Sequence, residues 1–247
     1  MSDRMERFEI KYCVPDPVAA AILSVARVFL VPERGLALGQ TQTITSLYLD
    51  TRELTFMRWH IEDEPERFKL RVRAYGAAPW PTMFGEIKEK QSGLSRKRRA
   101  EVPANRLDEL LNGSHLAFAN GLPPPAAVTL EEFAWRRLTL RASPIVLLRA
   151  SRESMRGGFG DTSAVTVDRD IVWQPASWRT FDADPSAWRP LPLPPTGSAI
   201  VEIKHGPRRP RWVAGLMGEL AGWRVAFSKY VAAASQLQSW EVASCLP

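Results

Sequence analysis

Hydrophobic and polar residues alternate with a period of two in eight segments of the chain. Because the side chains of a β-strand point alternately to its two faces, this alternation predicts strands. Turn residues bound the segments, and Gln91-Ser-Gly-Leu94 between two of them predicts a hairpin. The predicted strands are residues 7–14, 41–50, 68–76, 82–91, 95–102, 144–153, 164–168 and 198–205.

Five other segments show the spacing of an amphipathic helix, namely residues 17–29, 105–111, 130–140, 212–220 and 228–240. The proline-rich segments 121–127 and 191–197 are predicted to be loops rather than domain linkers, because strands of the same character lie on both sides. Eight strands with interspersed helices predict one α+β domain over residues 1–247. We expect an antiparallel eight-stranded β-barrel flanked by helices.

The polar faces of these strands are unusually ordered. In residues 67–75 one face carries four cations and the other is apolar, which is also typical of an ordinary surface strand. The tripeptide Glu-Ile-Lys then occurs three times, at residues 9–11, 86–88 and 202–204, always with Glu and Lys on one face. Since alternate residues of a closed barrel point inward, this repetition predicts a polar, basic lumen, with the apolar faces covered by helices.

The net charge of +6 is concentrated in one part of the chain. Residues 67–99 contain ten basic and two acidic residues, whereas the remainder carries 23 basic and 25 acidic residues. Buried cations without partners cost several kcal/mol each, so a basic lumen indicates a ligand with several negative charges. Carboxylates among the cations indicate Mg²⁺ or Mn²⁺, which bind one or two protein carboxylates together with phosphate oxygens. The sequence therefore predicts a site for metal-bound oligophosphate.

Nine short motifs together resemble a known family. The motifs, in chain order, are Phe8-Glu-Ile-Lys-Tyr12, Ser46-Leu-Tyr-Leu-Asp-Thr51, Lys69-Leu-Arg-Val-Arg-Ala-Tyr75, Gly85-Glu-Ile-Lys88, Ser95-Arg-Lys-Arg98, Ser151-Arg-Glu153, Val165-Thr-Val-Asp168, Val201-Glu-Ile-Lys204 and Phe227-Ser-Lys-Tyr230. With them the chain resembles the VTC-type polyphosphate polymerase domain, a branch of the triphosphate tunnel metalloenzyme superfamily, over nearly its whole length.

The resemblance implies an eight-stranded tunnel that transfers the terminal phosphate of ATP onto polyphosphate, with Mn²⁺ or Mg²⁺ as cofactor. It implies phosphate-gripping roles for Lys11, Arg71, Arg73, Lys88, Lys97, Arg152 and Lys229. It implies that Glu202 is the principal metal ligand, with Glu9 and Glu86 as further ligands. Ala164 and Ala226 stand where such domains often carry an Arg and a second Lys, so the basic lining is thinner here.

Three classes of function remain open at this point. The first is a metal-dependent polyphosphate polymerase, and the second is a tunnel-type hydrolase acting on triphosphate, polyphosphate or a nucleoside triphosphate. The third is a polyphosphate-binding module without turnover. Nucleic acid is disfavoured as a partner, because only alternate members of the basic run at 96–99 share a face.

Four smaller features complete the expectations. The N-terminal sequence has no signal-peptide pattern and no segment has the length of a membrane span, so we expect a cytoplasmic protein that needs a separate membrane partner for any export of product. Cys13 and Cys245 form no disulfide framework. Asp50 and Asp168 end predicted strands and are interpreted as caps or turn residues.

Overall fold

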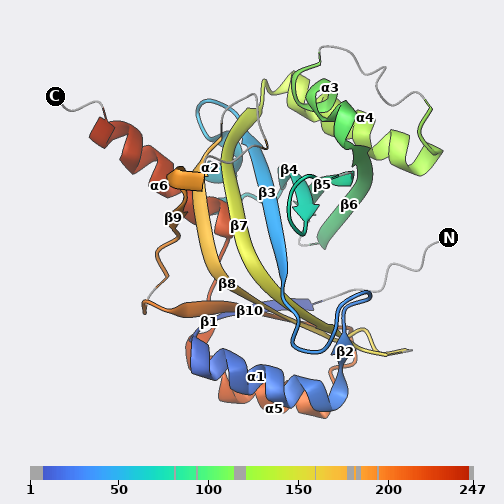
Figure 1. Ribbon diagram of the computed structural model, residues 1–247, viewed down its shortest axis with the longest axis vertical. Coiled ribbons are helices and arrows are strands. Elements are labelled where there is room, and N and C mark those ends of the chain that lie inside the picture. The colour runs from blue at the N-terminus through green and yellow to red at the C-terminus, as the bar shows by residue number, and fades with distance from the viewer. Residues whose placement is uncertain are drawn as a thin grey trace. The chain divides into compact units, whose positions relative to one another are not determined.

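The computed structural model describes residues 8–80, 82–92, 94–113, 121–158, 160–176, 181, 185–193 and 195–244. It is a mixed α/β structure with a large antiparallel sheet and flanking helices (Figure 1). The strands are β1 (Phe8–Pro15), β2 (Val31–Pro32), β3 (Gln42–Asp50), β4 (Arg67–Tyr75), β5 (Thr82–Gln91), β6 (Leu94–Pro103), β7 (Ser143–Arg156), β8 (Ala164–Pro175), β9 (Arg189–Pro190) and β10 (Ser198–His205).

The helices are α1 (Asp16–Phe29), α2 (Thr55–Ile61), α3 (Leu107–Asn112), α4 (Pro124–Thr139), α5 (Arg211–Glu219) and α6 (Lys229–Ser244), with short 3-10 helices at Ala104–Arg106, Pro185–Ala187 and Ala221–Trp223. Every predicted strand and helix is confirmed, as is the β5–β6 hairpin, in which Gln91 pairs with Leu94. The sequence patterns missed α2, β2 and β9, and the two strands are too short to show a period.

The expected closed eight-stranded barrel is wrong. The sheet has ten strands in the order β1-β10-β8-β7-β3-β4-β5-β6, with β2 beside β7 and β9 beside β8. Within the described residues its path ends at β1 and β6, and these two strands are not paired with each other. Alternation reveals which residues share a face, whereas closure depends on backbone hydrogen bonds between the first and last strands. The polar residues therefore lie on a face of an open sheet.

The chain divides into two compact units. The described residues within 1–43, 150–171 and 192–227 form unit 1, and those within 44–149, 172–191 and 228–247 form unit 2. Strands β3, β7 and β8 contribute residues to both units, and each unit has its own hydrophobic core. A single domain over residues 1–247 stays a prediction.

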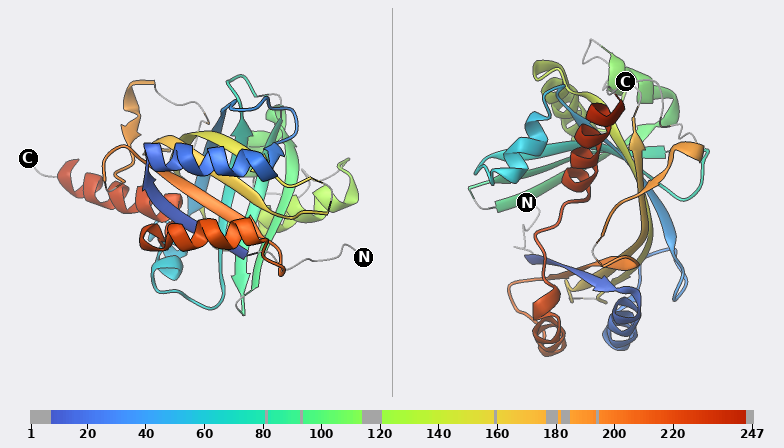
Figure 2. Two further views of the ribbon diagram at one scale, coloured as in Figure 1. Left: turned by 90° about the horizontal axis from the view of Figure 1, so that it is seen from below. Right: turned by 90° about the vertical axis from the view of Figure 1, so that its left-hand side faces the viewer.

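The core of unit 1 lies between its strands and two helices. Strand β1 pairs with β10 so that Ile10 faces Ile203 and Tyr12 faces Val201. Helix α1 buries residues at helical spacing, including Ile22 and Ala26, against the same core. Helices α1 and α5 lie side by side across this face (Figures 1 and 2). The apolar members of the Glu-Ile-Lys tripeptides in β1 and β10 are thus packed under helices, as predicted.

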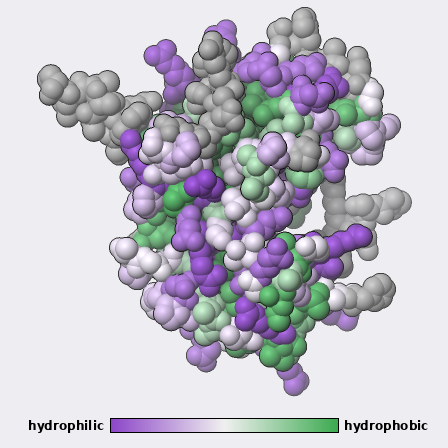
Figure 3. Space-filling view, in the orientation of Figure 1, coloured by the Kyte–Doolittle hydropathy of each residue, from purple (hydrophilic) through white to green (hydrophobic). Residues whose placement is uncertain are grey.

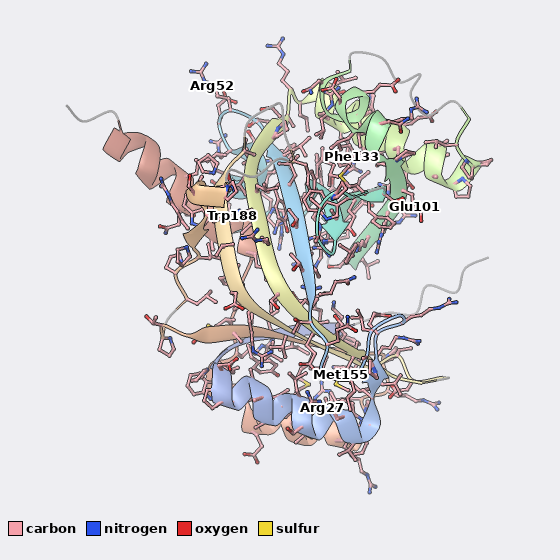
Figure 4. All side chains as sticks on the ribbon, in the orientation of Figure 1. Arg27, Arg52, Glu101, Phe133, Met155 and Trp188 are labelled. Carbon is pink, nitrogen blue, oxygen red and sulfur yellow. The ribbon has the colours of Figure 1, made fainter. Side chains whose placement is uncertain are left out.

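The core of unit 2 covers the apolar face of β4 and β5. Leu70, Val72 and Ile87 are fully buried in a cluster that includes Phe133 of α4, which Figure 4 labels. A Cβ atom at Gly85 would lie 2.6 Å from the side chain of a leucine on α4. Glycine at this position therefore lets α4 approach β5 closely, and the other face of the sheet is left to the polar residues.

Hydrophobic residues are also exposed at the end of α1. Val28 is 74% exposed, and Phe29 stacks on Trp212 of α5 with ring centroids 5.0 Å apart. Figure 3 shows hydrophobic residues gathered where this part of α1 lies. In the part of the chain that the structure describes, no helix has both the length and the apolar character needed to cross a membrane.

Candidate functional site

The polar face of β4, β5 and β6 is a grid of cations in unit 2. The register places Lys69 beside Lys88 and Lys88 beside Lys97 in one row. The next row is formed by Arg71, Glu86 and Arg99, and Arg73 follows in the row after that. We call this surface the cation face and define it by Lys69, Arg71, Arg73, Lys88, Lys97 and Arg99, with Glu86 among them.

Glu86 is the buried counter-ion of this face. Its side chain is 0% exposed, and Arg71 and Lys97 approach its two carboxylate oxygens to 2.6 Å and 2.7 Å. Arg99 and Arg73 lie at 3.8 Å and 4.0 Å from the same carboxylate. Burial alone would raise the pKa of Glu86, but the surrounding cations hold it well below its usual range. One carboxylate is therefore shared by four cations, and the face keeps an excess of positive charge.

The excess charge also changes the titration of its neighbours. The Tyr48 hydroxyl accepts a hydrogen bond of 2.9 Å from Arg71. Burial would raise the pKa of Tyr48, but the positive charges of Arg71 and Arg73 lower it. Burial, helped by repulsion from Arg71, lowers the pKa of Lys97 to about 7, although Glu86 acts in the opposite direction. These shifts all indicate a local field that favours a bound anion.

Helix α6 begins at the cation face. The Lys69 ammonium donates a hydrogen bond of 2.8 Å to the hydroxyl of Ser228, just before the helix. Lys229 is close enough to Tyr48 for its charge to lower the pKa of that hydroxyl. The hydroxyl of Tyr230 donates to the buried carboxylate of Asp50. The start of α6, and Lys229 with it, is therefore fixed beside the cation face.

Asp50 caps α2 in addition to binding Tyr230. Its carboxylate accepts backbone N–H groups from Thr51, Phe56 and Met57 at 2.6–2.9 Å. The interpretation of Asp50 as a cap is thus confirmed, and its contact with α6 was not expected. Burial raises the pKa of Asp50, and burial together with Asp50 raises the pKa of Tyr230. The raised pKa of Tyr230 keeps its hydroxyl protonated, so it remains the donor in this hydrogen bond.

Unit 1 presents a second polar face, on β1 and β10. The two Glu-Ile-Lys tripeptides run antiparallel, so Glu9 pairs with Lys204 and Lys11 with Glu202. Each ammonium lies 3.3–3.8 Å from both carboxylates. Lys11 also donates to the Phe227 carbonyl oxygen at 2.9 Å. We call Glu9, Lys11, Glu202 and Lys204 the balanced square, because its two positive and two negative charges cancel.

Arg152 and Asp168 form a tight pair in the same unit. Two nitrogens of the guanidinium lie 2.5 Å and 2.6 Å from the two carboxylate oxygens, and Asp168 is buried. Asp168 is therefore not a cap or turn residue, because β8 continues to Pro175 and places it inside the strand. A phosphate at Arg152 would share this guanidinium with Asp168.

The predicted site residues therefore fall into two groups, one on each unit. The structure brings together Arg71, Arg73, Lys88, Lys97, Lys229 and Glu86 in unit 2, and Lys11, Arg152, Glu9 and Glu202 in unit 1. Sequence reasoning missed Tyr48 and Ser46, which pair with Arg71 and Arg73, and it gave no role to Arg99. Strand parity could have found all three, since each shares a face with a predicted residue.

The two carboxylate environments differ in their fitness for a metal. The square offers two hard carboxylates whose contacts to flexible lysines are longer than ordinary hydrogen bonds, which fits a cation that takes its other ligands from phosphate and water. Glu86 is already saturated by close cations and does not fit this role. The described residues contain no cluster of three Asp, Glu, His or Cys side chains suited to a metal.

The fold and these faces define an α/β protein with one concentrated basic surface. The VTC domain model matches residues 6–238, so the chain belongs to the VTC domain family, which is associated with polyphosphate. This confirms the resemblance inferred from the motifs. No curated protein matches the chain.

Two solved structures share a weak likeness with it. The PH1819 protein from Pyrococcus horikoshii OT3 is 12% identical with a TM-score of 0.41, over 87% of this chain and 86% of that one. A chain in the Schizosaccharomyces pombe Mediator head module is 13% identical with a TM-score of 0.39, over 88% and 92%. At these TM-scores neither likeness supports an argument.

Proposed function

We propose that this protein is a metal-dependent phosphotransferase of the polyphosphate polymerase type, which moves the terminal phosphate of ATP onto a polyphosphate chain. The observation that carries the proposal is the cation face, where six Lys and Arg side chains share one face of the sheet and four of them lie around one buried carboxylate. Membership of the VTC domain family supports the same substrate class.

The chemistry that this face can perform is positioning and charge neutralisation. Phosphoryl transfer needs little covalent participation from a protein, since most of its catalysis comes from alignment and electrostatic stabilisation. The guanidinium of Arg71 is held by Glu86 and Tyr48, and that of Arg73 by Ser46 at 3.2 Å. These contacts fix the orientation of both guanidinium groups, so their remaining N–H donors are positioned in advance for phosphate oxygens.

Glu202 and Glu9 are the residues that we propose to hold the divalent metal. A bound Mn²⁺ or Mg²⁺ supplies positive charge that neutralises phosphate oxygens during transfer. Lys11 and Lys204 contact both carboxylates and keep the square neutral without the metal. Glu86, which was also expected as a ligand, acts in this proposal as a counter-ion only.

The test is to incubate the protein with ATP and Mn²⁺ and to measure ADP, free phosphate and long-chain polyphosphate together. The proposal expects ADP and polyphosphate in equal phosphoryl amounts, with little free phosphate. Free phosphate without polymer would replace it with a tunnel-type triphosphatase. Tight binding of polyphosphate without any product would leave a binding module. Arg96→Ala is a suitable control variant, because Arg96 is exposed and lies off the cation face.

A further inference from the structure

The cation face ends in aromatic side chains. Among the described residues of β4, β5 and β6 that point to this side of the sheet, the aromatic ones are Tyr75 and Phe84. They stand in adjacent strands, Phe84 beside Arg73 in the third row and Tyr75 two residues further along β4, with ring centroids 5.8 Å apart in an edge-to-face arrangement. Both side chains are only half-buried. A polar face that closes on two accessible rings is suited to a ligand with both a charged and a planar part.

Arg99 connects the rings to the charged rows. The centre of its guanidinium lies 3.5 Å from the ring centroid of Phe84 and 5.1 Å from that of Tyr75. Its Nε atom lies 3.8 Å from the buried carboxylate of Glu86. The planar guanidinium is therefore held between the counter-ion and the rings, and its side chain is still 36% exposed. Guanidinium planes and aromatic rings are the surfaces on which nucleobases stack.

The row that contains Phe84 carries one charge of each sign. Phe84 lies between Arg73 on β4 and Glu101 on β6, an exposed carboxylate labelled in Figure 4. An oligophosphate held by Arg73 that extended across this row toward β6 would meet a ring and then a negative charge. A neutral nucleoside would meet the ring, and the carboxylate could accept hydrogen bonds from its hydroxyl or amino groups. Phe84 and Glu86 are two residues apart along the strand, or about 7 Å, which a ribose between base and phosphate can span.

We propose that Tyr75, Phe84 and Arg99 form a nucleobase subsite, which selects a nucleoside triphosphate over inorganic oligophosphate as the ligand of the cation face. This inference rests on the proposed function, because it takes the cation face to be where the phosphates bind. Stacking is tolerant of base identity, since every base has a π face. The subsite therefore distinguishes nucleotides from inorganic phosphate chains more than it distinguishes one base from another.

The experiment compares two ligands on the same variants. The Kd values for ATP and for inorganic triphosphate are measured at matched ionic strength, without divalent metal so that no turnover occurs. The variants are Phe84→Leu and Tyr75→Leu, and the control is Trp135→Leu, which removes a 56% exposed aromatic residue from α4. Loss of base stacking should raise the Kd for ATP by roughly fivefold or more. The Kd for triphosphate should change by less than about twofold, and Trp135→Leu should change neither.

The outcomes separate this proposal from the function on which it rests. If Phe84→Leu weakens ATP and triphosphate equally, the ring only holds Arg99 in place and the subsite is refuted. If neither variant changes ATP binding, the subsite is also refuted, while the cation face stands. If the wild-type protein binds neither ligand, the proposed function itself fails. Should Phe84→Leu unfold, as judged by circular dichroism, Tyr75→Leu decides the question alone.

Discussion

The two polar faces are built from the same tripeptide and yet have opposite electrostatic characters. In unit 1, two copies of Glu-Ile-Lys pair antiparallel, so each carboxylate lies among ammonium groups and the charges cancel. In unit 2, the copy in β5 lies between two strands that present Lys and Arg, and its Glu86 is shared by four cations. The partner strands, rather than the tripeptide itself, therefore decide whether a face attracts a metal or an anion.

This difference assigns separate tasks to the two faces. Balanced carboxylates with long, exchangeable contacts suit a divalent cation, whereas an excess of fixed guanidinium groups suits phosphate. Assigning one role to Glu9, Glu86 and Glu202 because they share a motif would miss this difference between a metal ligand and a counter-ion. The Glu202→Gln and Glu86→Gln variants test this assignment. It fails if each variant shows the effect that is expected of the other.

The largest expected effect is on metal-supported turnover. Glu202→Gln removes a carboxylate charge from the balanced square while keeping the size of the side chain. Turnover should fall by roughly 100-fold or more, because several kcal/mol of transition-state stabilisation depend on the metal. Because Glu202 is buried, the free energy of unfolding should also fall, by about 1–3 kcal/mol. Mn²⁺ binding is measured by electron paramagnetic resonance and stability by urea unfolding.

Glu33→Gln is the matched control for that substitution. Glu33 is another carboxylate of unit 1, half exposed and paired with Arg156. The Glu33→Gln substitution should leave both Mn²⁺ affinity and turnover unchanged. Equal loss of Mn²⁺ binding in the Glu86→Gln and Glu202→Gln variants would contradict the division of tasks between the two faces.

The next effect is on stability and concerns Glu86. Glu86→Gln leaves Arg71, Lys97 and their neighbours without a buried counter-ion. Removing one partner from a buried ionic cluster costs about 3 kcal/mol or more, so the melting temperature should fall clearly. Sulfate or phosphate should restore much of the loss in this variant, since an anion can take the place of the carboxylate. A variant as stable as wild type, with no added response to sulfate, would show that the cation face needs no counter-ion.

The secondary structure and the polar faces could be predicted from the sequence, but closure of the sheet could not. Alternation in residues 67–75 and in the three tripeptides placed Arg71, Glu86 and Glu202 on polar faces, because the period of a strand is fixed by its backbone. Whether the first and last strands meet depends on twist and on hydrogen bonds made over the whole chain. The residue pattern within a single strand does not show whether the first and last strands pair.

The roles of individual charges were also beyond sequence reasoning. Arg152 was expected to grip phosphate, and it pairs instead with Asp168, whose strand proved longer than its alternation suggested. Glu86 looked like the other two Glu residues until the register showed the cations on both sides. Such partners come from strands far apart in the chain, so only the fold reveals them.

A smaller effect is expected on ligand affinity. Arg73→Ala removes one guanidinium from the cation face and should weaken triphosphate binding by about tenfold, the usual size of a charge-assisted contact. Triphosphate should raise the melting temperature of the wild-type protein more than sulfate at matched ionic strength, because it spans more of the cations. Arg96→Ala makes the same change in net charge on β6, in the same sheet but off this face. Equal weakening by both substitutions would indicate a generic basic surface.

The smallest expected effect is the uptake of less than one proton by Lys97 when an oligophosphate binds. Its pKa of about 7 means that the amine is mostly neutral at pH 8. A bound oligophosphate raises that pKa, so binding at pH 8 should take up protons, whereas below pH 6 the amine is already charged. Because the side chain is 41% exposed, water screens the effect and the uptake should stay below one proton per site.

Calorimetry in two buffers with different ionisation enthalpies measures this proton uptake directly. Lys97→Arg is the control, because a guanidinium stays charged at every pH used and should abolish the uptake while keeping the affinity. The direction in which the stability of the ligand-free protein changes with pH follows from the same pKa. A lysine whose folded pKa lies below its unfolded value destabilises the fold fully below pH 7, and this cost declines as the pH rises toward 10. Wild-type stability should therefore rise with pH over this range relative to Lys97→Arg, and a difference of the opposite sign would place Lys97 outside the field of the cation face.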